Sequence, residues 1–124
     1  MGRGPNSAGT VAVSPAASGG GCRNSSANGW TIGSCVSENG GWAWPDFYVN
    51  VLGTDVDTAE CEMQLIDQWG DPVSTSWWWC EEVGHYGPDR VAIRKGVHYY
   101  NRVTVFVNER RQVMLTAWSP QLTG

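Results

Sequence analysis

Residues 22–35 read CRNSSANGWTIGSC, and this stretch decides the fold. The dipeptide Asn28-Gly29 lies at its centre, and Asn-Gly is the strongest signal for a two-residue β-hairpin turn because both residues accept a positive φ. Folding the chain at this turn places Cys22 directly opposite Cys35. The spacing therefore predicts two antiparallel strands joined by a cross-strand disulfide.

The remaining two cysteines follow the same logic. The midpoint between Cys61 and Cys80 falls between Gly70 and Asp71, a second two-residue turn signal, so a hairpin centred there puts Cys61 opposite Cys80. Each disulfide closes a loop and stabilises the fold by roughly 3 kcal/mol in the chain-entropy model. The alternative is four free buried thiols in a cytosolic protein. Disulfides imply an oxidising compartment, so we expect a secreted, extracellular protein.

Composition limits the class of protein and its partners. The chain has 124 residues, enough for one domain, and a net charge of −4, which argues against nucleic acid as a partner. No apolar run approaches the ~20 residues of a membrane-spanning helix, so membrane insertion is not expected. There is no C-x-x-C motif and there are only two histidines, so we expect neither a metal site nor a cofactor.

From Cys22 onward the apolar residues recur at every second position. Cys61, Met63 and Leu65 share one face of a strand, while the intervening residues are polar, as in a half-buried antiparallel strand. The last hairpin is expected to pair 99–107 with 112–118. This spacing predicts an all-β fold: a small antiparallel β-sandwich of about seven or eight strands, with a small barrel as the alternative.

The N-terminal residues differ from the rest. Residues 1–21 contain no aromatic side chain and are expected to form a flexible tail, followed by a disulfide-stabilised domain at 22–124. The first five residues lack the apolar region of a signal peptide, so we expect a mature form with an added start residue. The tail is either a spacer or a peptide that binds in a partner's groove. Its one strand-like island consists of Thr10, Val11, Ala12, Val13 and Ser14.

Three consecutive tryptophans form the most unusual motif. The predicted hairpin places Trp78 on the core side, with Trp77 opposite Gln64 and Trp79 opposite Glu62 on the polar side. Two large rings on a solvent-facing surface suggest a protein interface, where Trp is enriched in hot spots, or a platform for sugar rings. The alternative is that a second sheet or the tail covers them.

Charge is unevenly distributed along the chain. Residues 38–82 hold ten carboxylates and no Lys or Arg, whereas residues 90–111 hold six basic residues and a single carboxylate. The two groups either neutralise each other across the fold or form oppositely charged faces that steer partners.

The chain offers little for catalysis. His85 is expected in a Gly/Pro loop and His98 in a strand, and no G-x-S-x-G motif surrounds a serine. There are two carboxylate pairs, Asp55 with Asp57 and Glu81 with Glu82. Such pairs could carry out acid–base chemistry or bind calcium, but they are common in solvated loops. We therefore predict that the protein has no catalytic residues and is not an enzyme.

The chain resembles a family of small secreted actinobacterial β-proteins with two disulfides. The resemblance covers roughly residues 22–120 and is carried by residues 29–36, 46–50, 80–88, 99–103 and 119–120. Among these proteins it is most similar to the adaptor subunits of umbrella toxin particles. The resemblance implies a non-enzymatic adaptor that links a trypsin-fold, lectin-like protein to a large toxin subunit, with residues 10–14 in the lectin's cleft.

We therefore expect a secreted protein-binding module whose contacts are residues 10–14 and the face with Trp77 and Trp79. A secreted protease inhibitor is the alternative, with 85–89 or the tail entering an active site. A carbohydrate-binding module that uses the same two tryptophans is a further alternative.

Overall fold

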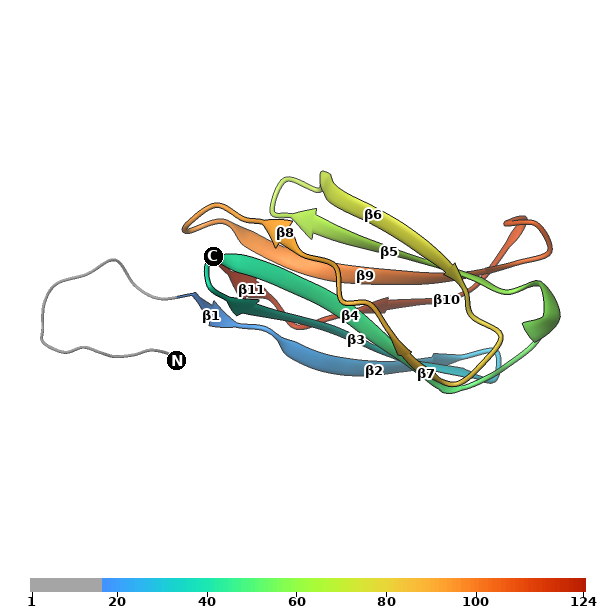
Figure 1. Ribbon diagram of the computed structural model, residues 1–124. Coiled ribbons are helices and arrows are strands. Elements are labelled where there is room, and N and C mark those ends of the chain that lie inside the picture. The colour runs from blue at the N-terminus through green and yellow to red at the C-terminus, as the bar shows by residue number, and fades with distance from the viewer. Residues whose placement is uncertain (1–16) are drawn as a thin grey trace, which may run out of the picture.

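The computed structural model describes residues 17–124 and shows two antiparallel sheets packed face to face (Figure 1). The six-stranded sheet has the order β1 (Ser18–Gly19), β11 (Leu122–Thr123), β9 (His98–Val107), β5 (Glu60–Asp67) and β6 (Pro72–Trp79), and β10 (Gln112–Trp118) also pairs with β9. The five-stranded sheet has the order β2 (Gly21–Ala27), β3 (Trp30–Asn39), β4 (Trp42–Val51) and β7 (Gly84–Tyr86), and β8 (Val91–Ala92) also pairs with β4. A 3-10 turn, η1 (Val56–Thr58), links β4 to β5.

This architecture confirms the predicted β-sandwich. Seven of the strands have seven to ten residues, and the four others are short segments along sheet edges. The edge partners of β9 and β4 are each split in two and the two-residue β1 is added, which is why the number of strands exceeds the expected seven or eight. Residues 84–86, expected in a loop, form β7 because they pair with 47–49 of β4.

The first hairpin forms as the sequence predicts. Ala27 pairs with Trp30 across Asn28 and Gly29, whose φ values are 52° and 81°. Cys22 stands opposite Cys35 and is bonded to it, with Cα atoms 4.1 Å apart. The left-handed turn at Asn-Gly therefore fixes the register that brings the two sulfur atoms together.

The second hairpin contains the predicted Cys61–Cys80 disulfide, but its register differs from the prediction. Cys61 pairs with Trp78 rather than with Cys80, because the turn forms at 68–70 and a bulge follows Leu65. Cys80 lies just beyond β6, where its N–H donates to the carbonyl of Ala59, and the Cα atoms of the disulfide are 5.8 Å apart. From Cys61 to Leu65 the shift is two residues, an even number, so the side chains paired there keep their predicted faces.

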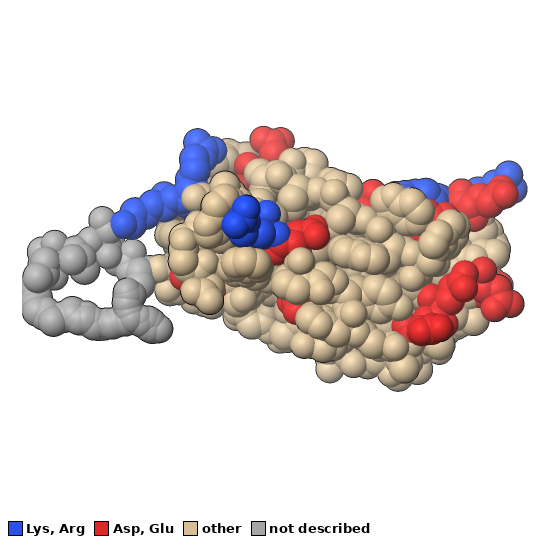
Figure 2. Space-filling model, in the orientation of Figure 1, with Lys and Arg blue, Asp and Glu red and all other residues tan. Residues whose placement is uncertain are grey.

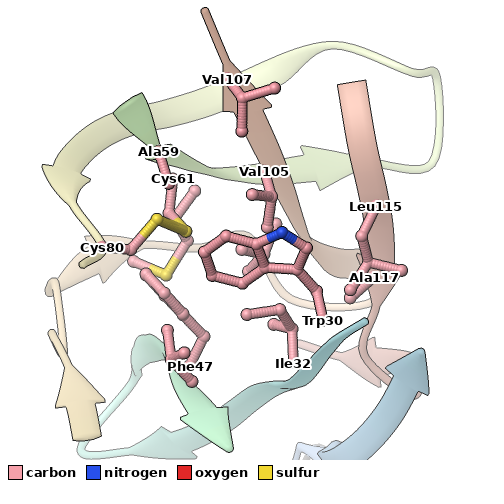
Figure 3. Close-up of a cluster of buried hydrophobic side chains, with 13 residues drawn as sticks. Trp30, Ile32, Phe47, Ala59, Cys61, Cys80, Val105, Val107, Leu115 and Ala117 are labelled. Carbon is pink, nitrogen blue, oxygen red and sulfur yellow. A yellow bond between two sulfur atoms is a disulfide. The ribbon is translucent and has the colours of Figure 1, made fainter. Parts of the chain in front are cut away.

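The larger core cluster lies between the sheets, centred on Trp30 (Figure 3). The Trp30 ring is fully buried, and its indole N–H donates to the carbonyl of Thr54 at 3.0 Å. The backbone of Gly53 lies against this ring: a Cβ there would come within 2.4 Å of an indole carbon, so no other residue fits without movement. Around the ring lie apolar side chains of both sheets and the buried disulfide. They include Ile32 of β3, Phe47 of β4, Cys61 and Met63 of β5, and Val103, Val105 and Val107 of β9.

The chain crosses from one sheet to the other near its N-terminal end. Ser18 and Gly19 pair with β11 in the six-stranded sheet, whereas β2 begins at Gly21 in the five-stranded one. Gly20 makes the crossing with φ 83°, and a Cβ on it would lie 2.6 Å from the carbonyl oxygen of Val36. Residues 18–21, placed in the tail by their composition, thus take part in both sheets.

Candidate functional site

The exposed tryptophans of β6 lie on the outer face of the six-stranded sheet. Trp77 and Trp79 are 51% and 56% exposed, while Trp78 points inward and packs edge-on against Phe47 at a centroid distance of 5.5 Å. The predicted inward and outward faces are therefore confirmed. The register places Trp77 opposite Glu62 and Trp79 opposite Glu60, two positions from the predicted partners.

The two exposed rings form a corner. Their centroids are 5.5 Å apart and their planes meet at 83°. Because the planes are almost perpendicular, the pair presents two aromatic walls rather than one flat platform.

An arginine-carboxylate network lies beside this corner. The Arg110 guanidinium is 2.9 Å from a carboxylate oxygen of Glu62, 3.6 Å from one of Glu60, and 4.4 Å from the centre of the Phe106 ring. The two glutamate side chains are only 13% and 22% exposed, which favours their ion pairs over those of fully exposed charges. We call this site the tryptophan face; it comprises Trp77, Trp79, Glu60, Glu62, Phe106 and Arg110.

The turn between β9 and β10 positions Arg110. Asn108, Glu109 and Arg110 have φ values of 55°, 60° and 65°, three successive left-handed residues of which none is glycine. Such conformations cost on the order of 1 kcal/mol each for ordinary residues. Hydrogen bonds between Asn108 and Thr58 of η1 hold the turn in place. The backbone thus adopts an unfavourable shape that brings Arg110 to the two glutamates.

The same sheet face continues beyond the tryptophan face. Arg102 donates to the side-chain oxygen of Gln64 and lies 5.4 Å from the centre of the Trp118 ring. Tyr100 meets Trp118 edge-on and donates its hydroxyl to Gln121. Most of the polar groups here are already paired within the chain.

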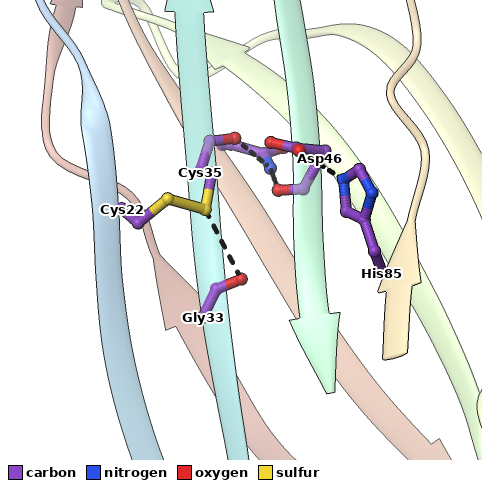
Figure 4. A network of polar contacts seen from close by, with 6 residues as sticks. Cys22, Gly33, Cys35, Asp46 and His85 are labelled. Carbon is purple, nitrogen blue, oxygen red and sulfur yellow. Dashed lines mark hydrogen bonds and ion pairs between the residues drawn. A yellow bond between two sulfur atoms is a disulfide. The ribbon is translucent and has the colours of Figure 1, made fainter. Parts of the chain in front are cut away.

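The outer face of the other sheet carries a histidine-carboxylate pair (Figure 4). The imidazole Nε2 of His85 is 2.5 Å from a carboxylate oxygen of Asp46, and the Tyr48 ring stacks on the imidazole at 4.5 Å. Asp46 lies on β4 and His85 on β7, 39 residues apart in the chain, so sequence reasoning missed the pair. Within the described residues, the hydrogen-bond partner of the His85 imidazole is the Asp46 carboxylate, and every cysteine is in a disulfide.

Charge is only partly segregated in space. In Figure 2 carboxylates gather at the end of the molecule near η1 and the β6–β7 connection, where basic groups of the β9–β10 turn also lie, and further basic groups lie at the opposite end near the β8–β9 connection. Arg110 is the basic residue of 90–111 that forms ion pairs with the acidic segment in the described part of the chain. Arg90, Arg94 and Arg102 lie instead over the rings of Trp42, Trp69 and Trp118.

Residues 10–14, the predicted binding island, lie outside the described residues. Across 17–124, no cluster of three or more His, Cys, Asp or Glu side chains is arranged to hold a metal ion. No helix in that range has the length and apolarity to cross a membrane.

Sequence reasoning identified Trp77 and Trp79 but missed Arg110 and Phe106. The alternation of β9 places Phe106 on the opposite face from Val105 and Val107, so it could have been found. Arg110 could not, because its position depends on three left-handed turn residues. Comparison of the chain with models of protein families, with curated proteins and with solved structures finds no match.

Proposed function

We propose that this chain is a secreted, non-enzymatic protein-binding module that holds a protein partner against the tryptophan face. One observation carries the proposal: Trp77 and Trp79 leave half of their surface in water although the core beneath them is closed by Trp78. A monomer gains little from such exposure, whereas tryptophan and arginine are among the residues most enriched in interface hot spots.

The resemblance to umbrella-toxin adaptors supports a connector with two contacts. In this proposal residues 10–14 bind a trypsin-fold, lectin-like protein, and the tryptophan face binds a large toxin subunit. The described chain begins beside the C-terminus, at the end of the sandwich away from the β6–β7 connection (Figure 1). Two partners could therefore bind without overlapping.

The alternatives fit the geometry less well. A protease inhibitor would present 85–89 as a protruding loop, yet 84–86 pair with β4 and His85 is held by Asp46. A carbohydrate-binding surface for an extended glycan would present coplanar rings, whereas Trp77 and Trp79 meet at 83°.

The test is quantitative capture of partners from the culture supernatant of the source organism, with the full chain as bait. The double variant Trp77→Ala/Trp79→Ala should weaken binding of one partner at least about tenfold, a loss of about 1.4 kcal/mol. Val13→Asp should weaken binding of another partner to a similar extent. Trp69→Ala is the matched control, because Trp69 is 59% exposed but lies at the β5–β6 turn. Equal binding by all variants would refute the proposal.

A further inference from the structure

The exposed tryptophans fall into two groups, those with an arginine of the chain over the ring and those without one. Four tryptophans are more than a third exposed: Trp69, Trp77, Trp79 and Trp118. Trp69 has Arg94 at 5.6 Å from its ring centre and Trp118 has Arg102 at 5.4 Å, so the chain supplies each of them with a guanidinium. Among the described residues, no cation of the chain lies over Trp77 or Trp79.

The surroundings of these two rings favour a positive charge. Glu60 and Glu62 stand directly opposite them and carry two negative charges against the single charge of Arg110. Other charged groups lie near this end of the face. The exposed carboxylates of Glu81 and Glu82 follow β6, and Glu109 and Arg111 form an ion pair with no net charge. Arg102 lies in the next cross-strand row, where it donates to the neutral side chain of Gln64.

The chain itself shows how this face binds a guanidinium. Arg110 lies over the Phe106 ring and pairs with both glutamates, so aromatic carbon and carboxylate oxygen are supplied together. A cation over a tryptophan ring gains about 0.5–1 kcal/mol when exposed and about 2 kcal/mol when desolvated. The corner of Trp77 and Trp79 offers two such rings next to the same carboxylates.

We propose that the tryptophan face recognises a cationic side chain, arginine or lysine, of a protein partner, which enters the corner between Trp77 and Trp79 beside Glu60 and Glu62. This inference rests on the proposed function and specifies the partner's chemistry. Charge complementarity selects this occupant: the corner is aromatic, its surroundings carry net negative charge, and its rings lack the arginine that the chain supplies to Trp69 and Trp118.

The test uses three short blocked peptides that differ only at a central arginine, lysine or citrulline. Citrulline keeps the shape of arginine without its charge. Binding is followed through the indole N–H signals of the tryptophans in two-dimensional NMR spectra. The arginine and lysine peptides should shift the signals of Trp77 and Trp79 and bind at least about threefold more tightly than the citrulline peptide. Equal binding of the charged and neutral peptides, or no binding, would overturn the inference.

Variants that change the charge of the tryptophan face should change the affinity for the arginine peptide in opposite directions. Glu60→Gln/Glu62→Gln should weaken binding of the arginine peptide about threefold or more, and Arg110→Gln should strengthen it because the carboxylates lose their internal partner. Trp69→Ala should leave it unchanged. A weaker affinity in Arg110→Gln, in a protein whose melting temperature shows an intact fold, would contradict a cationic ligand.

The outcome separates this inference from the proposed function. If Trp77→Ala/Trp79→Ala loses its protein partner while the charged peptides fail to bind, the tryptophan face is still an interface and only the cationic ligand is wrong. If the inference holds, the affinity for the captured partner should also fall as salt rises, and Glu60→Gln/Glu62→Gln should reduce that dependence.

Discussion

The side-chain amide of Asn101 in one sheet donates to the carbonyl oxygen of Cys35 in the other, at a distance of 2.9 Å. The same amide donates to the carbonyl of Asp46 at 3.0 Å, and the hydroxyl of Ser34 donates to the carbonyl of Asn101 at 2.8 Å. Asn101 is fully buried, so a polar connection between the sheets runs through an otherwise apolar interior. Such a connection fixes how the two sheets align.

Asn101→Ala should therefore destabilise the protein markedly. The change removes two buried hydrogen bonds and leaves a small cavity, so we expect a loss of about 2–4 kcal/mol in the free energy of unfolding. Urea denaturation measures it. Asn50→Ala is the control, since this exposed amide should cost under about 0.5 kcal/mol. Equal stability of the two variants would show that the connection contributes nothing.

The three tryptophans of β6 should contribute unequally to the stability of the fold. Trp78→Ala removes a ring that packs on Phe47 and Tyr86, and should cost about 3 kcal/mol. Trp77→Ala and Trp79→Ala should each cost under about 1 kcal/mol because these rings are half in water. Thermal unfolding of the three variants tests this order. A large loss in Trp77→Ala would mean that this ring supports the fold.

The buried Cys61–Cys80 disulfide should stabilise the domain substantially. Its loop spans 19 residues and both cysteines are fully buried, so Cys61→Ala/Cys80→Ala should lose about 3 kcal/mol. Denaturation of this variant under oxidising conditions gives the value. Peptide mapping without reduction should recover the Cys22–Cys35 and Cys61–Cys80 pairs in the parent protein, and any other pairing would contradict the structure.

Two N-terminal truncations should behave differently. Removing 1–16 leaves β1 intact and should not change the melting temperature. Removing 1–21 deletes the pairs that Ser18 and Gly19 make with β11 and the start of β2, and should lower it. Differential scanning calorimetry compares them. Identical melting temperatures would mean that β1 adds no stability.

Tyr86 should titrate at high pH. Burial is the largest cause and raises its pKa above the ordinary value of 10.0, the hydrogen bond to the Glu82 carbonyl opposes this in part, and the charges of Glu82 and Glu81 raise the pKa further. The unfolded chain therefore binds fewer protons than the folded one above pH 10, so stability falls as the pH rises through this window. Phenolate absorbance of the parent and Tyr86→Phe isolates the group. Glu81→Gln/Glu82→Gln should lower the pKa only in part, and an ordinary pKa in the parent would contradict its burial.

The sequence predicted the sandwich because local signals and tertiary packing agree. Asn28-Gly29 fixes one register through turn geometry alone, and the alternation of β5 and β9 identifies the inner face of the six-stranded sheet. The predicted register of β6 was wrong because the turn forms at 68–70 and not at Gly70-Asp71, and the bulge after Leu65 then makes the shift an even two residues, so the faces are as predicted. Of the tryptophan face, Trp77 and Trp79 were predicted from the alternation of β6, whereas the position of Arg110 depends on contacts between residues distant in sequence. The His85–Asp46 pair on the other sheet depends on such contacts too.

The crossing at Gly20 has a mechanical consequence for a protein held by its N-terminal end. A pull would peel β1 from β11 one residue pair at a time, because it acts on the end of a two-residue ladder. Three residues after Gly19 the load would reach Cys22, and the disulfide would pass it to Cys35 in β3, an interior strand of its sheet. Residues 23–34 would carry no tension, so the hairpin would keep its shape under force while the first few residues yield.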